Sequence, residues 1–210
     1  MSSPRPIGLL LAAGRSKRLG TQTKQLLPWP PGSERTMIEA SYDLLAPFCA
    51  AMFVVLDHDA DAITAALAPR VFSMVHGDAD APMFDSIRRG LRAIAAEHTD
   101  SVVLLHPADL PAVQQNTVQR MLDESSTTPH HALVPQCGDR GGHPVLIPPG
   151  MCEEILGHDG RDGLRGYWNL HSDQLRRIEV DDPATTMDVD TMALYKALGE
   201  RCRPRGRNDS

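Results

Sequence analysis

Closely spaced cysteines and long apolar runs are both missing from this sequence of 210 residues. The four cysteines, at positions 49, 137, 152 and 202, form no C-x-x-C pair, so we expect neither a zinc site nor a disulfide framework. The apolar run near the N-terminus, residues 7–12, is far too short to cross a membrane and lacks the layout of a signal peptide. These absences predict a cytoplasmic protein with no membrane partner.

Acidic residues are absent before Glu34, although the whole chain has a formal net charge of -6. Residues 1–33 contain five Lys and Arg residues, whereas the rest of the chain has 16 Lys and Arg against 27 Asp and Glu. Positive charge gathered in one segment of an acidic protein indicates a small anionic ligand. Nucleic acid is not expected as a partner, because it requires a broad basic face.

The length predicts one domain with a substantial core. Hydrophobic residues make up 41% of the chain and charged residues 23%, which is typical of a soluble globular protein. The final stretch is polar and basic and contains Pro and Gly. We therefore expect residues 1–199 to form the domain and residues 200–210 to be a disordered basic tail, with nucleic-acid binding by this tail as a weaker alternative.

Strand-like apolar runs alternate with helical patterns along the chain. We expect strands at residues 7–12, 51–56, 71–75, 101–105, 132–135, 144–147 and 175–180. We expect helices at residues 36–45, with Thr36 and Glu39 as a capping box, at 59–68 with Asp59 as the cap, and at 86–97, 114–122 and 191–198. Repeated βα units predict an α/β protein with a mostly parallel central sheet and helices on both faces, and the later strands suggest an antiparallel or mixed addition.

The first apolar run ends in a basic loop that reads AAGRSKRLGTQTK from Ala12 to Lys24. Glycines at the end of a first strand free backbone N–H groups that can cradle phosphates, and the cations can neutralise them. The loop has neither the G-x-x-x-x-G-K-[ST] of a P-loop nor G-x-G-x-x-G. From the residues alone, a strand followed by a basic solvated loop is the other interpretation.

The pattern LAAG-x-S-x-R-x-G, followed closely by Lys24 and LLP, resembles the opening signature of small nucleotidyltransferases. It is most similar to that of the molybdenum cofactor cytidylyltransferases and their MobA-like relatives. The resemblance implies a Rossmann-like, GT-A-type fold in which Arg18 and Lys24 are catalytic and hold the triphosphate. It implies nucleotide-binding residues in this loop, namely Leu11, Ala12, Ala13, Gly14, Arg15, Ser16, Arg18 and Lys24.

The stretch SVVLLHPADLP predicts a strand that ends just before Asp109, at the same edge of the sheet as the basic loop. Pro107 and Pro111 flank this aspartate and stiffen its backbone. A carboxylate there suits Mg²⁺, which prefers oxygen ligands and is often shared with phosphates, and a helix cap or loop aspartate is the alternative. The resemblance favours the metal, because the family has its metal aspartate at the end of this strand, usually as ADQP. The sequence PADLP keeps the aspartate and lacks the glutamine.

A second acidic cluster lies near the end of the chain, where MDVDT resembles the family's DIDT. Asp188 and Asp190 are two residues apart, so in a strand both would point to one face. We expect one of them, with Asp188 preferred, to complete the metal site. A solvated acidic strand end is the alternative.

Three further stretches resemble family segments that face the substrates. MFDSIRRGL, from Met83, partly matches GM-x-x-S-x-x-x-G-L and implies a nucleotide contact from Ser86, although Pro82 replaces the usual glycine and the helix could be simply amphipathic. GDRGGHPV and GRDGLRGYW resemble segments on the acceptor side, with a turn carrying a surface histidine as the alternative for the first. Glycines admit a bulky substrate, and histidine and arginine can bind its polar and phosphate groups. The implied acceptor-binding residues are Gly142, His143, Asp162 and Arg165; Trp168 is expected in the core.

Five motifs in the family's order imply an Mg²⁺-dependent transfer of a nucleotidyl group from an NTP to a phosphorylated acceptor, with release of pyrophosphate. In the family, LAAG at the first loop resembles the CTP users, whereas a glycine pair there marks the GTP users, and GGHPV indicates the same branch. The resemblance therefore implies CTP as donor and molybdopterin as acceptor. A molybdoenzyme or its chaperone is a further possible partner. Transfer to another phosphorylated small molecule and non-catalytic binding of the molybdenum cofactor are the alternatives.

Two other site classes are not supported by the sequence. His130 and His131 have no nearby partner set for a transition metal. No G-x-S-x-G nucleophile elbow is present, so an acyl-transfer triad is not expected.

Overall fold

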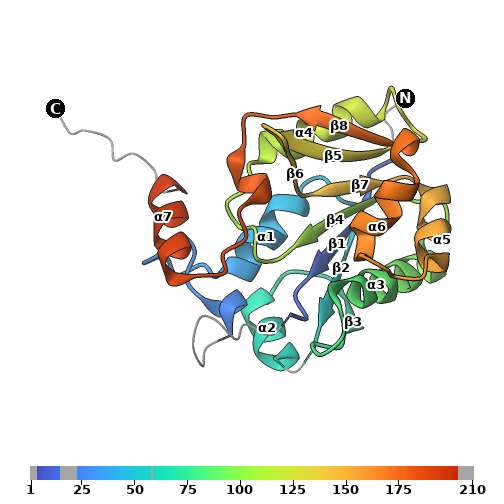
Figure 1. The fold of residues 1–210 in the computed structure, drawn as a ribbon. Coiled ribbons are helices and arrows are strands. Elements are labelled where there is room, and N and C mark those ends of the chain that lie inside the picture. The colour runs from blue at the N-terminus through green and yellow to red at the C-terminus, as the bar shows by residue number, and fades with distance from the viewer. Residues whose placement is uncertain (1–3, 15–22, 58, 203–210) are drawn as a thin grey trace.

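The computed structural model describes residues 4–14, 23–57 and 59–202. These residues form a central sheet with helices on both sides (Figure 1). Within these ranges, no helix combines the length and the apolar character needed to cross a bilayer. The predicted α/β class with a mostly parallel sheet is confirmed.

The sheet has eight strands in the order β3-β2-β1-β4-β7-β5-β6, and β8 pairs with β5. The parallel part consists of β1 (Ile7–Leu11), β2 (Ala51–Leu56), β3 (Ser73–His76) and β4 (Val103–Pro107). The mixed part consists of β5 (Ala132–Cys137), β6 (Arg140–Gly141), β7 (Val145–Ile147) and β8 (Leu175–Glu179). β7 is antiparallel to β4 and β5, whereas β8 is parallel to β5, so the expected mixed addition is confirmed.

Two apolar layers cover the two faces of this sheet. One face packs against α1 (Met37–Leu45), α2 (Ala60–Leu67) and α4 (Gln115–Ser125). The other packs against α3 (Met83–Glu97), α5 (Pro149–Gly157) and α6 (Gly163–Leu170). Alternation within the strands supplies both layers, because Leu10 belongs to the first and Leu9 to the second.

The C-terminal helix α7 (Met192–Cys202) contributes Tyr195 and Leu198 to a third, smaller apolar cluster, which also includes Trp29. It follows the 3-10 helix η3 (Pro183–Thr186), and two other short 3-10 helices are η1 (Lys24–Leu26) and η2 (Ser172–Gln174). α7 continues to Cys202, so the first residues of the segment expected to be a tail are helical; residues 203–210 lie outside the described residues.

Local signals in the sequence account for most of the elements. Thr36 and Glu39 form both hydrogen bonds of the predicted capping box at the start of α1. Asp59 precedes α2 as predicted, but its side chain does not cap the helix; it accepts a hydrogen bond from Thr23 Oγ1 at 2.7 Å instead. All four cysteines are free thiols.

Four elements, one strand and three helices, differ clearly from the expectations. β3 begins at Ser73 rather than Val71, which is 85% exposed. α5 and α6 are absent from the predicted elements because both are short, and glycines and prolines interrupt their sequences. α3 begins earlier than expected, at Met83.

Strand register brings two distant segments together at the carboxyl edge of the sheet. Leu11 at the end of β1 is paired with Pro107 at the end of β4. The backbone N–H of Ala108 donates to the carbonyl oxygen of Leu11 at 2.9 Å, which extends the pairing by one residue. The segment after β1 and the turn that carries Asp109 are therefore neighbours.

His106 lies in β4 and is fully buried, with 0% of its surface exposed. Its Nε2 lies 3.2 Å from the carbonyl oxygen of Leu110, so the imidazole closes the turn between them. Burial, helped by the nearby His143, lowers the pKa of His106 from 6.5 to about 3. The side chain is therefore neutral at physiological pH and can donate to Leu110.

This buried histidine predicts a loss of stability on acidification. Its pKa is lower in the folded state than in the unfolded state, so its contribution is complete above about pH 6.5 and decreases as the pH falls toward about 3. We expect the free energy of unfolding, measured with urea between pH 7.5 and 4.5, to fall less steeply in His106→Gln than in the wild type. The exposed His130 provides the control, since His130→Gln should keep the wild-type slope. Equal slopes for His106→Gln and the wild type would contradict this account.

Candidate active site

The turn that carries Asp109 is held from several sides. Ser41 Oγ of α1 donates to the carbonyl oxygen of Ala108 at 2.9 Å, in a fully buried contact. The backbone N–H of Val189 donates to the carbonyl oxygen of Asp109 at 2.9 Å. Val189 itself is fully buried. These bonds fix the Asp109 backbone and attach the chain segment after η3 to it.

Asp109, Asp188 and Asp190 converge at this edge of the sheet. One carboxylate oxygen from each lies within 4.8 Å of the other two. Asp188 and Asp190 are not in a strand, contrary to expectation. They lie in an irregular segment in which the N–H of Asp190 donates to the carbonyl oxygen of Asp188 at 3.0 Å. The structure thus brings all three predicted metal ligands together.

The three carboxylates repel one another. At about this separation, each pair costs roughly 1–4 kcal/mol at an effective dielectric constant between 80 and 20. Partial burial of the Asp188 carboxyl group, a side-chain hydrogen bond with Asp190, and the charges of Asp190 and Asp109 raise its pKa above the usual value. Such a set of oxygen donors suits a hard divalent cation.

Lys24 lies inside this cluster, so the alternative interpretation of a basic solvated loop does not hold for this residue. It begins η1 and is only 6% exposed. Its Nζ lies 3.0 Å from Asp109 Oδ2 and 2.6 Å from Asp190 Oδ1. A single ammonium group therefore neutralises part of the charge of two carboxylates.

The expected nucleotide loop is described only at its start, where Ala12 and Ala13 are each 5% exposed. Their side chains lie in the two apolar layers on opposite faces of the sheet. A Cβ atom on Gly77 would lie only 2.6 Å from the Ala13 Cβ, so the backbone after β3 packs directly on this alanine. The methyl groups are thus core groups, and what Ala12 and Ala13 can present to a nucleotide is backbone.

Gln25 stabilises the same loop, a role that the sequence analysis missed. It is 6% exposed, and its Nε2 lies 3.3 Å from the Ala12 carbonyl oxygen and 3.4 Å from that of Gly14. Leu11 is buried at the end of β1, and Gly14 is exposed. The remaining predicted loop residues, Arg15, Ser16 and Arg18, lie outside the described residues. Ser86 is in α3 and is 6% exposed, so its side chain presents little surface to a ligand.

The four predicted acceptor-binding residues line one cleft, which has a volume of about 720 Å³. Phe84 of α3 and Trp168 of α6 also line it. Asp162 lies directly before α6 with a left-handed backbone, at φ 56°. Trp168, expected in the core, is partly buried against it and also borders the cleft. The residues brought together here are Gly142, His143, Asp162 and Arg165.

Close packing connects this cleft to the carboxylates. A Cβ atom on Gly142 would lie 2.2 Å from the carbonyl oxygen of Thr185, so only glycine fits there. The N–H of His143 donates to the same oxygen at 2.8 Å. Thr185 belongs to η3, which leads to Asp188. Burial lowers the pKa of His143 to about 4, although the charge of Asp109 opposes the shift, so His143 is neutral at physiological pH.

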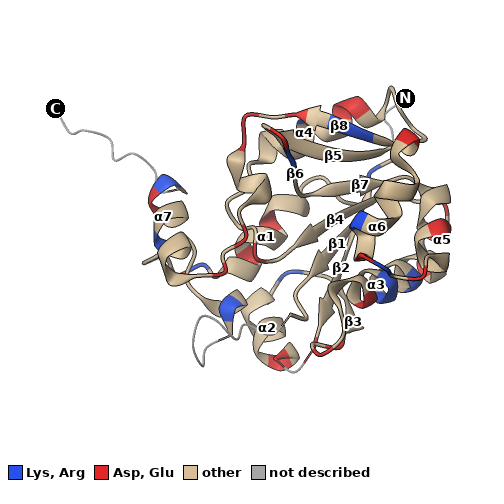
Figure 2. Cartoon of the chain, in the orientation of Figure 1, with Lys and Arg blue, Asp and Glu red and all other residues tan. Residues whose placement is uncertain are grey.

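Charge is distributed unevenly around the site (Figure 2). The connection between β8 and α7 carries acidic residues, while Lys and Arg in the described part of the chain are spread over many elements and loops, among them α3, α6, β8 and α7. Asp188 and Asp190 are thus part of a mainly acidic segment, whereas Asp109 comes from the turn after β4.

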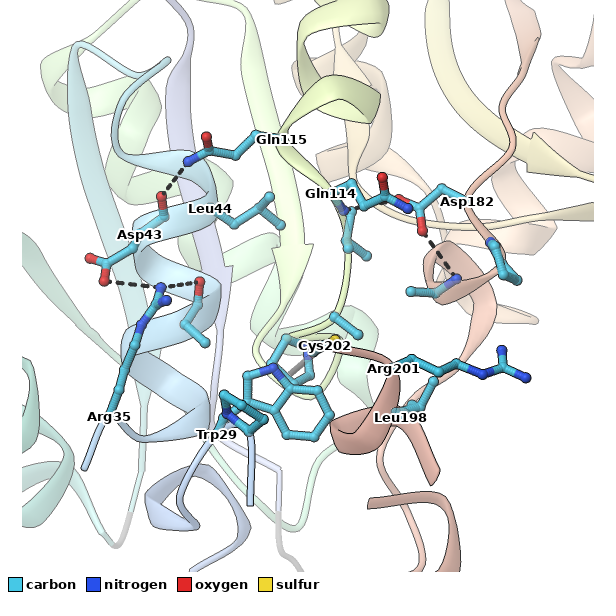
Figure 3. A pocket seen from close by; sticks show the side chains of 17 residues that line it. Trp29, Arg35, Asp43, Leu44, Gln114, Gln115, Asp182, Leu198, Arg201 and Cys202 are labelled. Atoms are coloured by element: carbon cyan, nitrogen blue, oxygen red, sulfur yellow. Dashed lines mark hydrogen bonds and ion pairs between the residues drawn. The ribbon is translucent and has the colours of Figure 1, made fainter. Parts of the chain in front are cut away.

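A second cleft of about 720 Å³ lies between α1, the start of α4 and α7 (Figure 3). Its carboxylates are engaged in structural contacts. Asp182 accepts hydrogen bonds from the Gln114 N–H and Thr117 Oγ1, and Asp43 forms ion pairs with Arg35 and Arg70. The predicted site residues do not line this cleft, so it is not the candidate active site.

Residues 8–176 match the family described as MobA-like NTP transferase domain. The chain is 30% identical to a nicotine blue oxidoreductase of Paenarthrobacter nicotinovorans over 91% of its length and 95% of the relative's. It is also 30% identical to a molybdenum cofactor guanylyltransferase of Pseudomonas aeruginosa, over 75% of each chain.

Solved structures support the same grouping. The crystal structure of Rv0371c from Mycobacterium tuberculosis, in complex with manganese, has 28% sequence identity and a TM-score of 0.73. The match covers 93% of this chain and 98% of that one. A nucleotidyl transferase from Methanothermobacter, at 21% identity, shares the fold with a TM-score of 0.78 over 95% of this chain and 98% of that one. With a family match over most of its length, this chain belongs to the MobA-like NTP transferase family.

Proposed function

We propose that this protein is an Mg²⁺-dependent cytidylyltransferase that transfers CMP from CTP to molybdopterin and releases pyrophosphate. The observation that carries the proposal is the convergence of Asp109, Asp188 and Asp190 around Lys24 at the carboxyl edge of the sheet. Ligands of open α/β sheets bind at this edge. A cleft for a second substrate is connected to the same carboxylates through Thr185.

The carboxylates fit a divalent metal in their chemistry, because each provides an oxygen donor and the three oxygens lie close together. Two of these carboxylates, those of Asp109 and Asp190, already bind one cationic group, the ammonium group of Lys24. When bound, Mg²⁺ would neutralise negative charge that develops on the phosphates. The manganese complex of a relative is consistent with a divalent ion, and the choice of Mg²⁺ is part of the proposal.

The chain's own groups would bind and orient the reactants. We assign the triphosphate to Arg18, Lys24 and the backbone of the loop after β1. We assign the acceptor to the cleft residues His143, Asp162 and Arg165, with Gly142 giving the backbone close access. A phosphate oxygen of the acceptor attacks the α-phosphorus, the bond from that phosphorus to the bridging oxygen breaks, and pyrophosphate leaves. Positioning and electrostatics suffice, so no covalent enzyme nucleophile is required.

The base and the acceptor are the finer parts of the proposal. The LAAG loop favours CTP, whereas the name of the Pseudomonas relative is that of a guanylyltransferase, so GTP is the competing donor. Another phosphorylated small molecule is the competing acceptor. A molybdoenzyme or its chaperone would receive the product, and the cytoplasm is the proposed location. The alternative is a protein that only binds the molybdenum cofactor; such a protein would use the same cleft but would release no pyrophosphate.

A second candidate is an oxidoreductase, which the 30% identity to the nicotine blue oxidoreductase over 91% of the chain favours. The two candidates make different demands on the carboxylates. Nucleotidyl transfer requires Asp109 for the metal, whereas a redox reaction places no such requirement on it. Pyrophosphate release from CTP and molybdopterin, measured with Mg²⁺, tests the first candidate directly.

Asp109→Asn tests the metal assignment. An amide brings no negative charge to the ion, so we expect pyrophosphate release to be lost at limiting Mg²⁺. The same substitution at Asp188 and at Asp190, assayed across an Mg²⁺ titration, should raise the metal requirement for each residue that acts as a ligand. Full activity of Asp109→Asn at limiting Mg²⁺ would make this aspartate a structural turn residue.

Arg18→Ala and Lys24→Ala test the triphosphate assignment. Loss of a preorganised electrostatic contact removes about 2–4 kcal/mol of transition-state stabilisation. We therefore expect kcat/KM to fall roughly 30- to 1,000-fold. Steady-state kinetics of both variants, with circular dichroism as the control for folding, measures this effect. Near-normal kcat/KM in both folded variants would exclude the role.

The base assignment predicts a preference for CTP over GTP. Selection by shape alone contributes about 1–3 kcal/mol, so the preference should be measurable but incomplete. Calorimetric titration of both nucleotides with Mg²⁺ gives the comparison. Equal affinities, or tighter binding of GTP, would replace the cytidylyl assignment and leave nucleotidyl transfer intact.

A further inference from the structure

We propose that Lys24 is an internal counter-cation of the carboxylate site, and that a divalent metal and the nucleotide bind cooperatively because both draw on this one lysine. The inference rests on the proposed function, since it assumes that the carboxylates bind a metal. It adds that the ammonium group of Lys24 holds the carboxylates together before any ligand binds. Lys24 then changes partners when the ligands arrive.

The contacts of Lys24 create a direct competition. Its ammonium group engages Asp109 Oδ2 and Asp190 Oδ1, which are two of the oxygens available to a metal. A divalent cation that shares either oxygen lies close to the ammonium group, and the two positive charges repel. The side chain is only 6% exposed, so water screens this repulsion poorly. Metal binding without nucleotide is therefore opposed by Lys24.

The backbone of Lys24 is fixed, whereas its side chain can change partner. η1 holds the residue through the hydrogen bonds of Leu26 N–H to the Thr23 carbonyl oxygen and of Leu27 N–H to the Lys24 carbonyl oxygen. The four-carbon stem of lysine carries a point charge that can turn about several bonds. A triphosphate bound beside the loop after β1 would offer anionic oxygens to the ammonium group of Lys24. Transfer of the ammonium to these oxygens frees the carboxylates for the metal.

Thermodynamic linkage makes the effect reciprocal. If the nucleotide raises the metal affinity by some factor, the metal raises the nucleotide affinity by the same factor. A coupling of about tenfold lies within the usual range for linked sites. The site would thus bind metal weakly alone and tightly together with nucleotide.

Mn²⁺ binding, followed by electron paramagnetic resonance, tests the inference without turnover. Lys24→Met removes the charge and keeps the length of the side chain. We expect it to bind Mn²⁺ about tenfold more tightly than the wild type in the absence of nucleotide. Lys196→Met is the matched control, because this exposed lysine of α7 undergoes the same change and should leave the Mn²⁺ affinity unaltered.

A second titration adds α,β-methylene CTP or its GTP counterpart, whichever binds. The nucleotide should raise the Mn²⁺ affinity of the wild type about tenfold and that of Lys24→Met much less. The titration of the wild type is informative even if the variant fails to fold. If bound nucleotide does not raise the Mn²⁺ affinity of the wild type, the inference is overturned. Equal or weaker Mn²⁺ binding by folded Lys24→Met also overturns it.

Asp109→Asn separates this inference from the proposed function. If wild type and Asp109→Asn bind Mn²⁺ equally in the presence of nucleotide, the carboxylates are not the metal site and both proposals fall. If Asp109→Asn loses Mn²⁺ while Lys24→Met gains no affinity, the metal site stands and the counter-cation role alone is wrong.

Discussion

Mutual repulsion among Asp109, Asp188 and Asp190 is the constraint to which the surrounding structure is adapted. Three carboxylate oxygens within 4.8 Å of one another need nearby positive charge and a backbone that resists their separation. Lys24 provides the charge at two of them. The hydrogen bond from Val189 to Asp109 joins the two acidic segments, and Val189 is anchored in the core. The site is therefore assembled by parts of the chain that are far apart in sequence.

Strand order explains why these parts meet. Parallel pairing of β1 with β4 places the loop after β1 beside the Asp109 turn, and Ser41 and His106 hold that turn from within the core. The irregular segment after η3 brings Asp188 and Asp190 to the same edge. Its attachment to Gly142 and His143 places the cleft that we propose for the acceptor next to the carboxylates. Two substrates can thus be presented to one group of charges.

The sequence was informative where the signal is local. Apolar runs predicted β1 and β2 closely and β4 two residues too early, the capping box marked the start of α1, and PADLP pointed to Asp109. Lys24 shows the limit of such reasoning. Its position in a basic loop left a solvated lysine as the alternative, and only the tertiary structure places it between two carboxylates. Gln25 and His106 were missed for the same reason, because their partners are backbone carbonyls whose positions depend on the folded loop and turn. The helices α5 and α6 were missed because glycine and proline mask their short apolar faces.

A fold alone does not decide the chemistry, and this chain is similar both to a guanylyltransferase and to an oxidoreductase by name. What decides it is how the carboxylates and Lys24 respond to ligands. The most direct measurement is the anomalous diffraction of Mn²⁺ in crystals grown with a non-transferable nucleotide. Our account predicts an Mn²⁺ peak bounded by Asp109 and at least one of Asp188 and Asp190, with the Lys24 ammonium group moved onto the phosphates. A metal bound elsewhere, or Lys24 still between Asp109 and Asp190 in the complex, would contradict it.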